Sequence, residues 1–208
     1  MRWYDIGQNS PEWEELRAGR LTASNFAVIM ANQPKAFSDA AKRLAVQIAF
    51  ERINGYSMRA HYGDGYSNAD MERGHAEEPV ARALYESETF CTVQNGGFFC
   101  NDYIGCSPDG LVGDDGGIEI KSVLPQTHAA TKRRDNFDPA YRWQILGNLA
   151  HTGREWWDFV SYCSFAPEPH KLLIYRVRRE QYSTQIQQLL AREKRFIDLI
   201  NQSIKDFS

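Results

Sequence analysis

The segment 107–121 constrains this chain more than any other, because it places Asp109, Glu119 and Lys121 on one short hairpin. Asp109 lies in a Ser-Pro-Asp-Gly turn, and Glu119 and Lys121 stand two residues apart in the strand-like run that follows. Side chains at i and i+2 of a strand point to the same face. Glu119 and Lys121 therefore project together, while the isoleucines at the alternate positions face a core.

These residue types suit the metal-assisted cleavage of a phosphodiester bond. Asp109 and Glu119 are 119 − 109 = 10 residues apart across one turn, and a hairpin brings such positions side by side. Mg²⁺ or Mn²⁺ on carboxylate oxygens can stabilise phosphate charge, acidify a water and assist the leaving oxygen. The backbone carbonyl of Ile120 is a candidate further ligand, and Lys121 could orient or deprotonate the water. Either motif alone is common in purely structural turns and strands, and their order and alternation favour a nuclease site.

The composition is that of an ordinary folded chain. At 208 residues, with 42% hydrophobic and 25% charged residues, one domain spanning 1–208 is expected. The sequence contains no apolar run of about 20 residues, the length of a membrane helix. Its Met-Arg-Trp-Tyr-Asp start also lacks the apolar region of a signal peptide. We therefore expect a cytoplasmic protein with no membrane partner.

Charge and cysteine content bear on the class of protein. The formal net charge of −3 argues against a surface coated in positive charge for DNA, although local basic patches can still contact phosphate. Three acids gathered at a metal site would account for that charge. The four cysteines include no Cys-x-x-Cys pair, so reduced buried thiols are expected rather than a zinc or iron–sulfur site.

Hydrophobic periodicity and turn residues predict an α/β chain. Helices are expected over 11–18, from Thr22 through Met30, and over 38–54, 68–86, 138–152 and 180–205. Strands are expected over 89–93, 98–100, 104–106, 117–121, 156–162 and 171–177, the first two joined by a hairpin turn at 95–97. Pro79 suggests a break or kink in its helix, and the stretch 55–68 is expected to be an exposed loop.

Three other places offer functional side chains. Arg17, Thr22 and Ser24 surround the junction of the first two helices, where the unpaired N–H groups of a helix N-terminus suit a phosphate. Simple capping by Thr22 or Ser24, with Arg17 in solvent, is the alternative. In Glu77-Glu78 the two carboxylates point about 100° apart, so at most one faces a given site. Gln144 lies beside the apolar stripe of its helix, where it can border a site.

Pro108-Asp109 followed by Glu119-Ile120-Lys121 resembles the PD-(D/E)XK nuclease signature. The surrounding motifs resemble, more narrowly, those of the lambda-exonuclease-like (YqaJ-type) recombination exonucleases. These motifs are Arg17-x-Gly19 with Leu21-Thr22-Ala23-Ser24, Gly74-x-x-x-Glu78-x-x-Ala81, Cys106-Ser107-Pro108-Asp109-Gly110-Leu111, Gly117-Ile118-Glu119-Ile120-Lys121 and Ala140-Tyr141-x-x-Gln144. The resemblance runs from about residue 11 to 160 with the motifs in order, which is far more specific than the short signature.

The resemblance implies a restriction-endonuclease-like core, with a central mixed β-sheet flanked by helices on both sides. It also implies a site. Asp109, Glu119 and the Ile120 carbonyl would hold Mg²⁺, for which Mn²⁺ could substitute, and Glu78 would support the metal or its water. Lys121 would activate the nucleophile. The remaining implied site residues are Gln144, which would position water or phosphate, and Arg17, Thr22, Ser24 and Ser107, which would form a pocket for a 5′-phosphate.

The implied activity is processive 5′→3′ digestion of double-stranded DNA from phosphorylated 5′ ends. It leaves 3′ overhangs for a single-strand annealing partner in recombination, in a bacterial cell that carries a phage or prophage. Members of the family form ring-shaped homotrimers that enclose DNA, and a ring needs positive charge only on its inner surface. A restriction- or repair-type endonuclease on the same fold is the alternative. The cysteine spacing disfavours a Cas4-like iron–sulfur nuclease, and the retained acids disfavour a silent DNA-end-binding protein.

Two departures from the family pattern stand out. Pro125 lies four residues after Lys121, where the family commonly places its proline nearer the lysine. The residue that splits the duplex is not assigned, and the segment 62–71 is where we expect it. The basic run Lys132-Arg133-Arg134 could contact the DNA backbone or simply form a solvated face.

Overall fold

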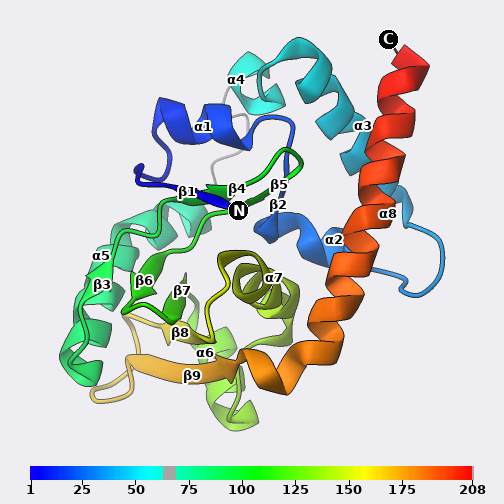
Figure 1. Cartoon of the computed structure of the whole chain (residues 1–208). Coiled ribbons are helices and arrows are strands. Elements are labelled where there is room, and N and C mark those ends of the chain that lie inside the picture. The colour runs from blue at the N-terminus through cyan, green and yellow to red at the C-terminus, as the bar shows by residue number, and fades with distance from the viewer. Residues whose placement is uncertain (63–68, 208) are drawn as a thin grey trace.

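The computed structural model describes residues 1–62 and 69–207 and arranges their strands in two sheets (Figure 1). One sheet has the strand order β3-β6-β7-β8-β9 and the other has the order β1-β4-β5-β2. The strands are β1 (Arg2–Tyr4), β2 (Leu21–Thr22), β3 (Val93–Gln94), β4 (Phe98–Cys100), β5 (Ile104–Cys106), β6 (Gly110–Val112), β7 (Gly116–Ser122), β8 (Trp156–Tyr162) and β9 (Leu172–Arg178). The helices are α1 (Pro11–Arg17), α2 (Phe26–Met30), α3 (Asp39–Asn54), α4 (Met58–Tyr62), α5 (Ala69–Thr89), α6 (Pro125–Arg134), α7 (Arg142–Thr152) and α8 (Ser183–Phe207).

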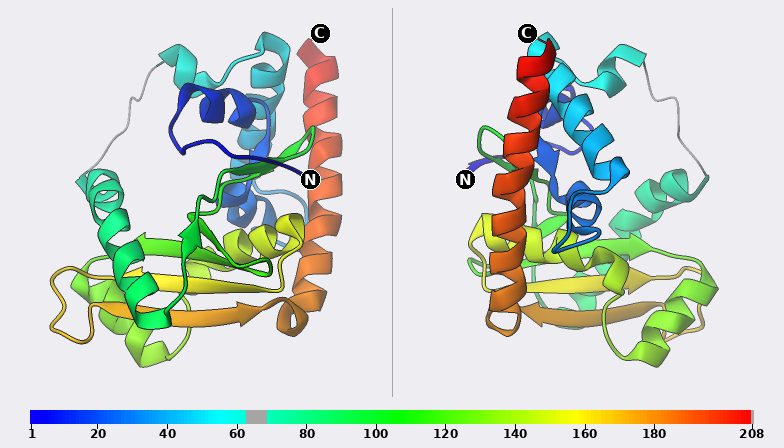
Figure 2. Two further views of the ribbon diagram at one scale, coloured as in Figure 1. Left: turned by 60° about the vertical axis from the view of Figure 1, so that its left-hand side comes forward. Right: turned by 90° about the vertical axis from the view of Figure 1, so that its right-hand side faces the viewer.

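The five-stranded sheet is mixed and lies between helices. β7 and β8 run parallel, and the other neighbouring strands are antiparallel. On one face, Ala81 and Tyr85 of α5 pack with Ile118 and Ile120 of β7, and α5 crosses this face of the strands in the left view of Figure 2. On the other face, α7 packs its apolar side chains against Phe159 of β8. The expected fold class is therefore confirmed.

The four-stranded sheet forms around the β4–β5 hairpin. β1 adds to it antiparallel to β4, and β2 adds parallel to β5. The expected hairpin between 89–93 and 98–100 is wrong, because β3 pairs with β6 whereas β4 belongs to the other sheet. The glycine-rich turn at 95–97 thus connects two sheets. At Gly96, a Cβ would lie 1.8 Å from the Pro108 carbonyl oxygen, so only glycine fits there.

Helix α8 runs along α2, α3 and α7 (Figure 1) and carries the predicted apolar stripe. One buried residue on it, Arg192, is only 2% exposed. Its guanidinium donates hydrogen bonds to the carbonyl oxygens of Ile29 (2.8 Å), Ala31 (3.5 Å) and Lys35 (2.8 Å). Arg192 thereby satisfies carbonyls at and after the end of α2, which would otherwise lack partners.

One local expectation about helices is wrong, one holds only in part, and one helix was not predicted. Of the break or kink expected at Pro79, the break is absent, because α5 continues through this residue. The expected helix from Thr22 is instead a short 3₁₀ turn, η1 (Ala23–Asn25), followed by the five-residue α2, and Thr22 itself ends β2. Helix α6 was not expected. It begins at Pro125, a favoured first position, and Lys132-Arg133-Arg134 form its exposed last turn.

The stretch 55–68 is not entirely a loop, since Met58–Tyr62 forms α4. Residues 63–68 lie outside the described residues, and with them most of the segment expected to hold the duplex-splitting residue. Among the helices of the described ranges, none is long and apolar enough to cross a membrane.

Candidate active site

The β6–β7 hairpin brings the predicted acids and lysine together. Asp109 immediately precedes β6, whose Gly110 pairs with Ile118. Asp109 Oδ2 accepts a hydrogen bond from the Ile120 N–H at 2.7 Å, and Lys121 Nζ lies 2.5 Å from Glu119 Oε1. A strand residue points its N–H and its C=O to the same side. The Ile120 carbonyl therefore faces the side of Asp109, as a candidate metal ligand must.

Helix α7 supplies hydrogen-bond donors to Glu119, whose exposed fraction is 0%. Gln144 Nε2 donates to Glu119 Oε1 at 2.5 Å, and Asn148 Nδ2 donates to Oε2 at 3.2 Å. Just before α7, the Tyr141 ring lies 5.1 Å from Lys121 Nζ, a cation–π distance. Both oxygens of the buried carboxylate are thus held from one helix, and the ammonium beside it rests on an aromatic ring.

Glu78 of α5 completes the group of acids. Glu78, Asp109 and Lys121 line a hollow of about 550 Å³, and a second hollow of about 250 Å³ also has Glu78 and Asp109 in its wall. Arg82 lies one turn beyond Glu78. Its guanidinium lies 3.7 Å from Glu78 Oε1 and donates to the main-chain oxygen of Asp109. Glu78 and Asp109 therefore stand between two openings large enough for parts of a substrate.

The neighbouring acid, Glu77, points elsewhere. Its carboxylate accepts hydrogen bonds from Ser122, at the end of β7, and from Ser164, after β8. The expectation that at most one of the two adjacent acids faces the site is confirmed. Glu77 instead ties α5 to the strand ends beside the hollow.

Burial and the mutual repulsion of the carboxylates raise the pKa values of Glu119 and Glu78. Burial, and then the negative charge of Asp109, raise the pKa of Glu119 to about 8 and that of Glu78 to about 7. Burial alone would lower the pKa of Lys121, but the charges of Glu119 and Asp109 outweigh it and raise that pKa above its ordinary value. The positive charges of nearby side chains do not fully neutralise these carboxylates. A bound metal cation would supply further positive charge.

The oxygens of the site are hard donors of the kind that Mg²⁺ and Mn²⁺ prefer. In the arrangement seen, Lys121 occupies Glu119 Oε1 and the Ile120 N–H occupies Asp109 Oδ2. Across residues 1–62 and 69–207, no three Asp, Glu, His or Cys side chains are grouped as metal ligands. Glu119 can offer Oε1 to a cation only after the Lys121 ammonium moves away.

The predicted phosphate-binding residues form two separate groups of contacts, one that includes Ser107 and Arg17 and one between Thr22 and Ser24. The Trp13 indole N–H donates to Ser107 Oγ at 2.8 Å, and the Arg17 guanidinium lies 4.1 Å above the Trp13 ring. The hydroxyls of Thr22 and Ser24 are 3.1 Å apart. Because β2 pairs parallel with β5, the ends of both strands meet at one edge, Ser24 following one strand and Ser107 the other.

The alternative of simple capping does not describe this junction. Thr22 makes no side-chain capping hydrogen bond to η1, and Arg17 is half-buried against Trp13 rather than solvated. Burial lowers the pKa of Arg17, although an arginine stays charged at any ordinary pH. A half-buried guanidinium, stacked on the ring whose N–H binds Ser107, is a suitable partner for a phosphate.

Gly19 fixes the chain between Arg17 and Thr22. Its φ of +68° is a conformation that favours glycine, and a Cβ there would lie 2.6 Å from Arg52 Cγ. Its N–H donates to Glu51 Oε2 at 3.0 Å, and its carbonyl accepts from Arg52 at 3.1 Å. The positive φ and the close approach of Arg52 explain why a glycine stands at this position.

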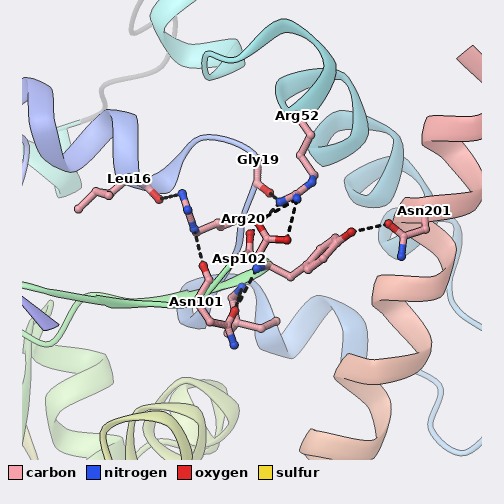
Figure 3. Close-up of polar contacts among 9 residues, drawn as sticks. Leu16, Gly19, Arg20, Arg52, Asn101, Asp102 and Asn201 are labelled. Atoms are coloured by element: carbon pink, nitrogen blue, oxygen red, sulfur yellow. Dashed lines mark hydrogen bonds and ion pairs between the residues drawn. The ribbon is translucent and has the colours of Figure 1, made fainter. Parts of the chain in front are cut away.

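Two arginines fasten this segment to the β4–β5 turn, as Figure 3 shows. Arg20 donates to the carbonyl oxygens of Leu16 (2.6 Å) and Asn101 (2.7 Å). Arg52 donates to the Asp102 carbonyl at 2.8 Å and forms an ion pair with its carboxylate at 3.1 Å. The segment that carries the candidate phosphate residues is therefore held from both sides.

Sequence reasoning missed Asn148, Arg82 and Trp13. Each lies four residues from a residue that was predicted, namely Gln144, Glu78 and Arg17. Positions four apart share one face of a helix. That spacing is the signal that could have found all three.

The mixed sheet, with Asp109, Glu119 and Lys121 on one hairpin, has the features of the PD-(D/E)XK nuclease class. The YqaJ-like viral recombinase domain family matches residues 12–155, and the chain belongs to this family. No curated protein matches the chain.

Solved structures agree with this assignment. The crystal structure of an alkaline exonuclease, LHK-Exo from Laribacter hongkongensis, has a TM-score of 0.82 and 31% identity, covering 94% of this chain and 95% of that one. A structure of LHK-Exo in complex with dAMP has a TM-score of 0.72 and 32% identity over 94% and 99%. A phage related exonuclease from Haemophilus somnus 129PT, 13% identical with a TM-score of 0.66 over 94% and 99%, shares the fold. The chain is an enzyme of the exonuclease class, a deoxyribonuclease.

The raised carboxyl pKa values predict that the metal-free protein loses stability as pH rises. The folded protein holds the protons of Glu119 and Glu78 to higher pH than the unfolded chain, which releases them near 4.5. Folding therefore takes up protons between the unfolded and folded pKa values, and the free energy of unfolding falls across that window. We expect the melting temperature in EDTA to fall by several degrees from about pH 5.5 to about pH 8.

Asp109→Asn is the matched variant, because it removes the charge that raises both values and keeps the side-chain size. Its melting temperature should depend less on pH in the same window. A wild-type melting temperature that stays constant or rises across this window would contradict the crowding of charge described for the site.

Proposed function

We propose that the chain, acting as one domain over 1–208, is a Mg²⁺-dependent processive 5′→3′ exonuclease on double-stranded DNA with 5′-phosphorylated ends. It leaves 3′ overhangs that serve homologous recombination by strand annealing. The observation that carries the proposal is that Asp109, Lys121 and Glu78 line one open hollow, with the buried Glu119 paired to Lys121 directly behind it. Membership of the YqaJ-like family supports it.

Asp109, Glu119 and the Ile120 carbonyl would hold the metal, with Glu78 as a weaker or water-mediated partner. Bound there, Mg²⁺ or Mn²⁺ supplies charge stabilisation to the phosphate and makes a water more acidic. Glu78 borders the hollow and can orient that water through its carboxylate. Gln144 keeps Glu119 Oε1 in place and, being only partly buried, can also reach water or phosphate.

Lys121 has two states in this proposal. With the acids unneutralised its ammonium is firmly charged, and it pairs with Glu119. Once a bound cation neutralises the carboxylates, the ammonium would be free to donate to the attacking water or to the scissile phosphate. A bound cation would offset the carboxylate charges that raise the pKa of Lys121, and the lysine could then also accept a proton from the water.

The end-binding pocket would comprise Arg17, Ser24, Ser107 and Thr22. Support comes from the strand ends that bring Ser24 and Ser107 to one edge and from the desolvated Arg17 guanidinium. Ser107 lies two residues before Asp109, so a phosphate held there would sit one short turn from the metal ligands. Such a distance suits an enzyme that cleaves a phosphodiester bond close to a bound 5′ end.

The proposed substrate predicts a strong dependence on the 5′ end group. On linear duplex with Mg²⁺, 5′-phosphorylated ends should be digested at least about tenfold faster than 5′-hydroxyl ends, because a charge-assisted hydrogen bond contributes about 1.5–3 kcal/mol. Arg17→Met should reduce the ratio of the two rates toward one. Arg43→Met, on the exposed face of α3, is the matched control and should keep the ratio.

Closed circular duplex belongs in the same experiment. An end-dependent exonuclease leaves it intact, whereas a restriction- or repair-type endonuclease on the same fold cuts it. Equal rates of digestion from 5′-phosphorylated and 5′-hydroxyl ends would refute the phosphate pocket but not the proposed catalytic centre.

We further propose a ring-shaped homotrimer around DNA, working with a single-strand annealing protein. The net charge of −3 supports a ring, because only the surface that faces DNA then needs positive charge. Sedimentation at working concentration should show a particle of three chains, which for a chain of 23.9 kDa separates clearly from a monomer. A monomer under those conditions would remove the ring.

A further inference from the structure

Asn148 contacts Glu119 from the buried interior of the protein. It is fully buried on α7, with an exposed fraction of 0%, and its amide Nδ2 donates to Glu119 Oε2 at 3.2 Å. Gln144, one helical turn earlier, donates to the other oxygen at 2.5 Å. Asn148 does not line the hollow beside Lys121, so it can act on the reaction only through Glu119.

The remaining polar atom of the Asn148 side chain is not satisfied. In the part of the chain that the structure describes, Oδ1 is buried and has no hydrogen-bond partner. Its neighbours on α7, Ile145 and Leu149, belong to a hydrophobic cluster. A buried amide with an unpaired oxygen is less favourable than an apolar side chain of similar size. The packing of the side chain therefore does not explain why an asparagine stands here.

The hydrogen bond to Glu119 does explain it. A glutamate carboxylate can rotate about its last torsion, and Gln144 and Lys121 both contact the same oxygen, Oε1. Only Asn148, among the described residues, holds Oε2 with a side-chain donor. With both oxygens fixed, the plane of the carboxylate is set.

We propose that Asn148 is a positioning residue that sets the plane of the Glu119 carboxylate for the incoming cation. This inference rests on the proposed function, in which Glu119 is a metal ligand. Residues that orient a metal ligand typically change metal affinity by about 10–100-fold when they are replaced. Asn148 should therefore matter for the affinity of the metal and little for the affinity of DNA.

The test compares Asn148→Leu with the wild type, using Mn²⁺ alone as the probe. Mn²⁺ binding to the DNA-free protein is measured by electron paramagnetic resonance or calorimetry, and the melting temperature is measured in EDTA. We expect Asn148→Leu to weaken Mn²⁺ binding about tenfold, with only a modest fall in melting temperature from the loss of one buried donor to Glu119 Oε2. The affinity for duplex DNA in EDTA should not change. Thr152→Val, which removes a hydroxyl bonded to the Asn148 carbonyl oxygen, is the control on the same helix and should bind Mn²⁺ as the wild type does.

Asn148→Ala serves as the second variant, in case leucine does not fit beside Glu119. Folded variants that bind Mn²⁺ as tightly as the wild type would overturn the proposal. So would a large loss of melting temperature in both variants, because it would show that Asn148 supports the fold. Failure of the proposed function looks different: the wild-type protein itself would then bind no Mn²⁺ or cleave no DNA.

Discussion

Glu119 is a carboxylate with no exposed surface, in a strand that is buried on both faces, and it lies beside a second acid. Burying such a group is costly unless donors or cations compensate it. The surrounding elements supply that compensation: Lys121 from the same strand, and Gln144 and Asn148 from α7. The packing of α7 on the sheet is thus tied to the chemistry of the site, because moving the helix would strip the carboxylate of its donors.

The turn at Ser107-Pro108-Asp109 joins the two halves of the site. Asp109 bonds to β7, while Ser107 accepts from Trp13 on α1 and donates to the Gly97 carbonyl. The Pro108 carbonyl lies against Gly96 and also accepts a hydrogen bond from Gln8. The connection between the two sheets is therefore rigid where it passes the site. A phosphate bound near Ser107 and a metal bound near Asp109 would keep a constant separation.

Much of this arrangement can be predicted from the sequence, and the reasons are local. Alternation around Glu119 and Lys121 predicts the strand and its faces, and the apolar period predicts α8. The sheet to which β3 belongs could not be predicted. A glycine-rich turn has the same sequence features whether it joins neighbouring strands of one sheet or strands of two different sheets. Helix α6 has no apolar stripe and depends on buried His128, which contacts Ser161 and the His170 carbonyl. Such polar contacts over long sequence separations leave no periodic signal.

The most direct test of the central claim is cleavage by Asp109→Ala and Lys121→Ala, measured together with DNA binding. Both variants should lose cleavage of 5′-phosphorylated linear duplex while they bind it measurably, because they remove the proposed metal ligand or the charge beside it and leave the proposed Arg17 pocket intact. Asp114→Ala, which changes an exposed acid in the turn of the same hairpin, should cleave as the wild type does. Retained cleavage in a folded Asp109→Ala or Lys121→Ala protein would show that this hairpin is not the catalytic centre.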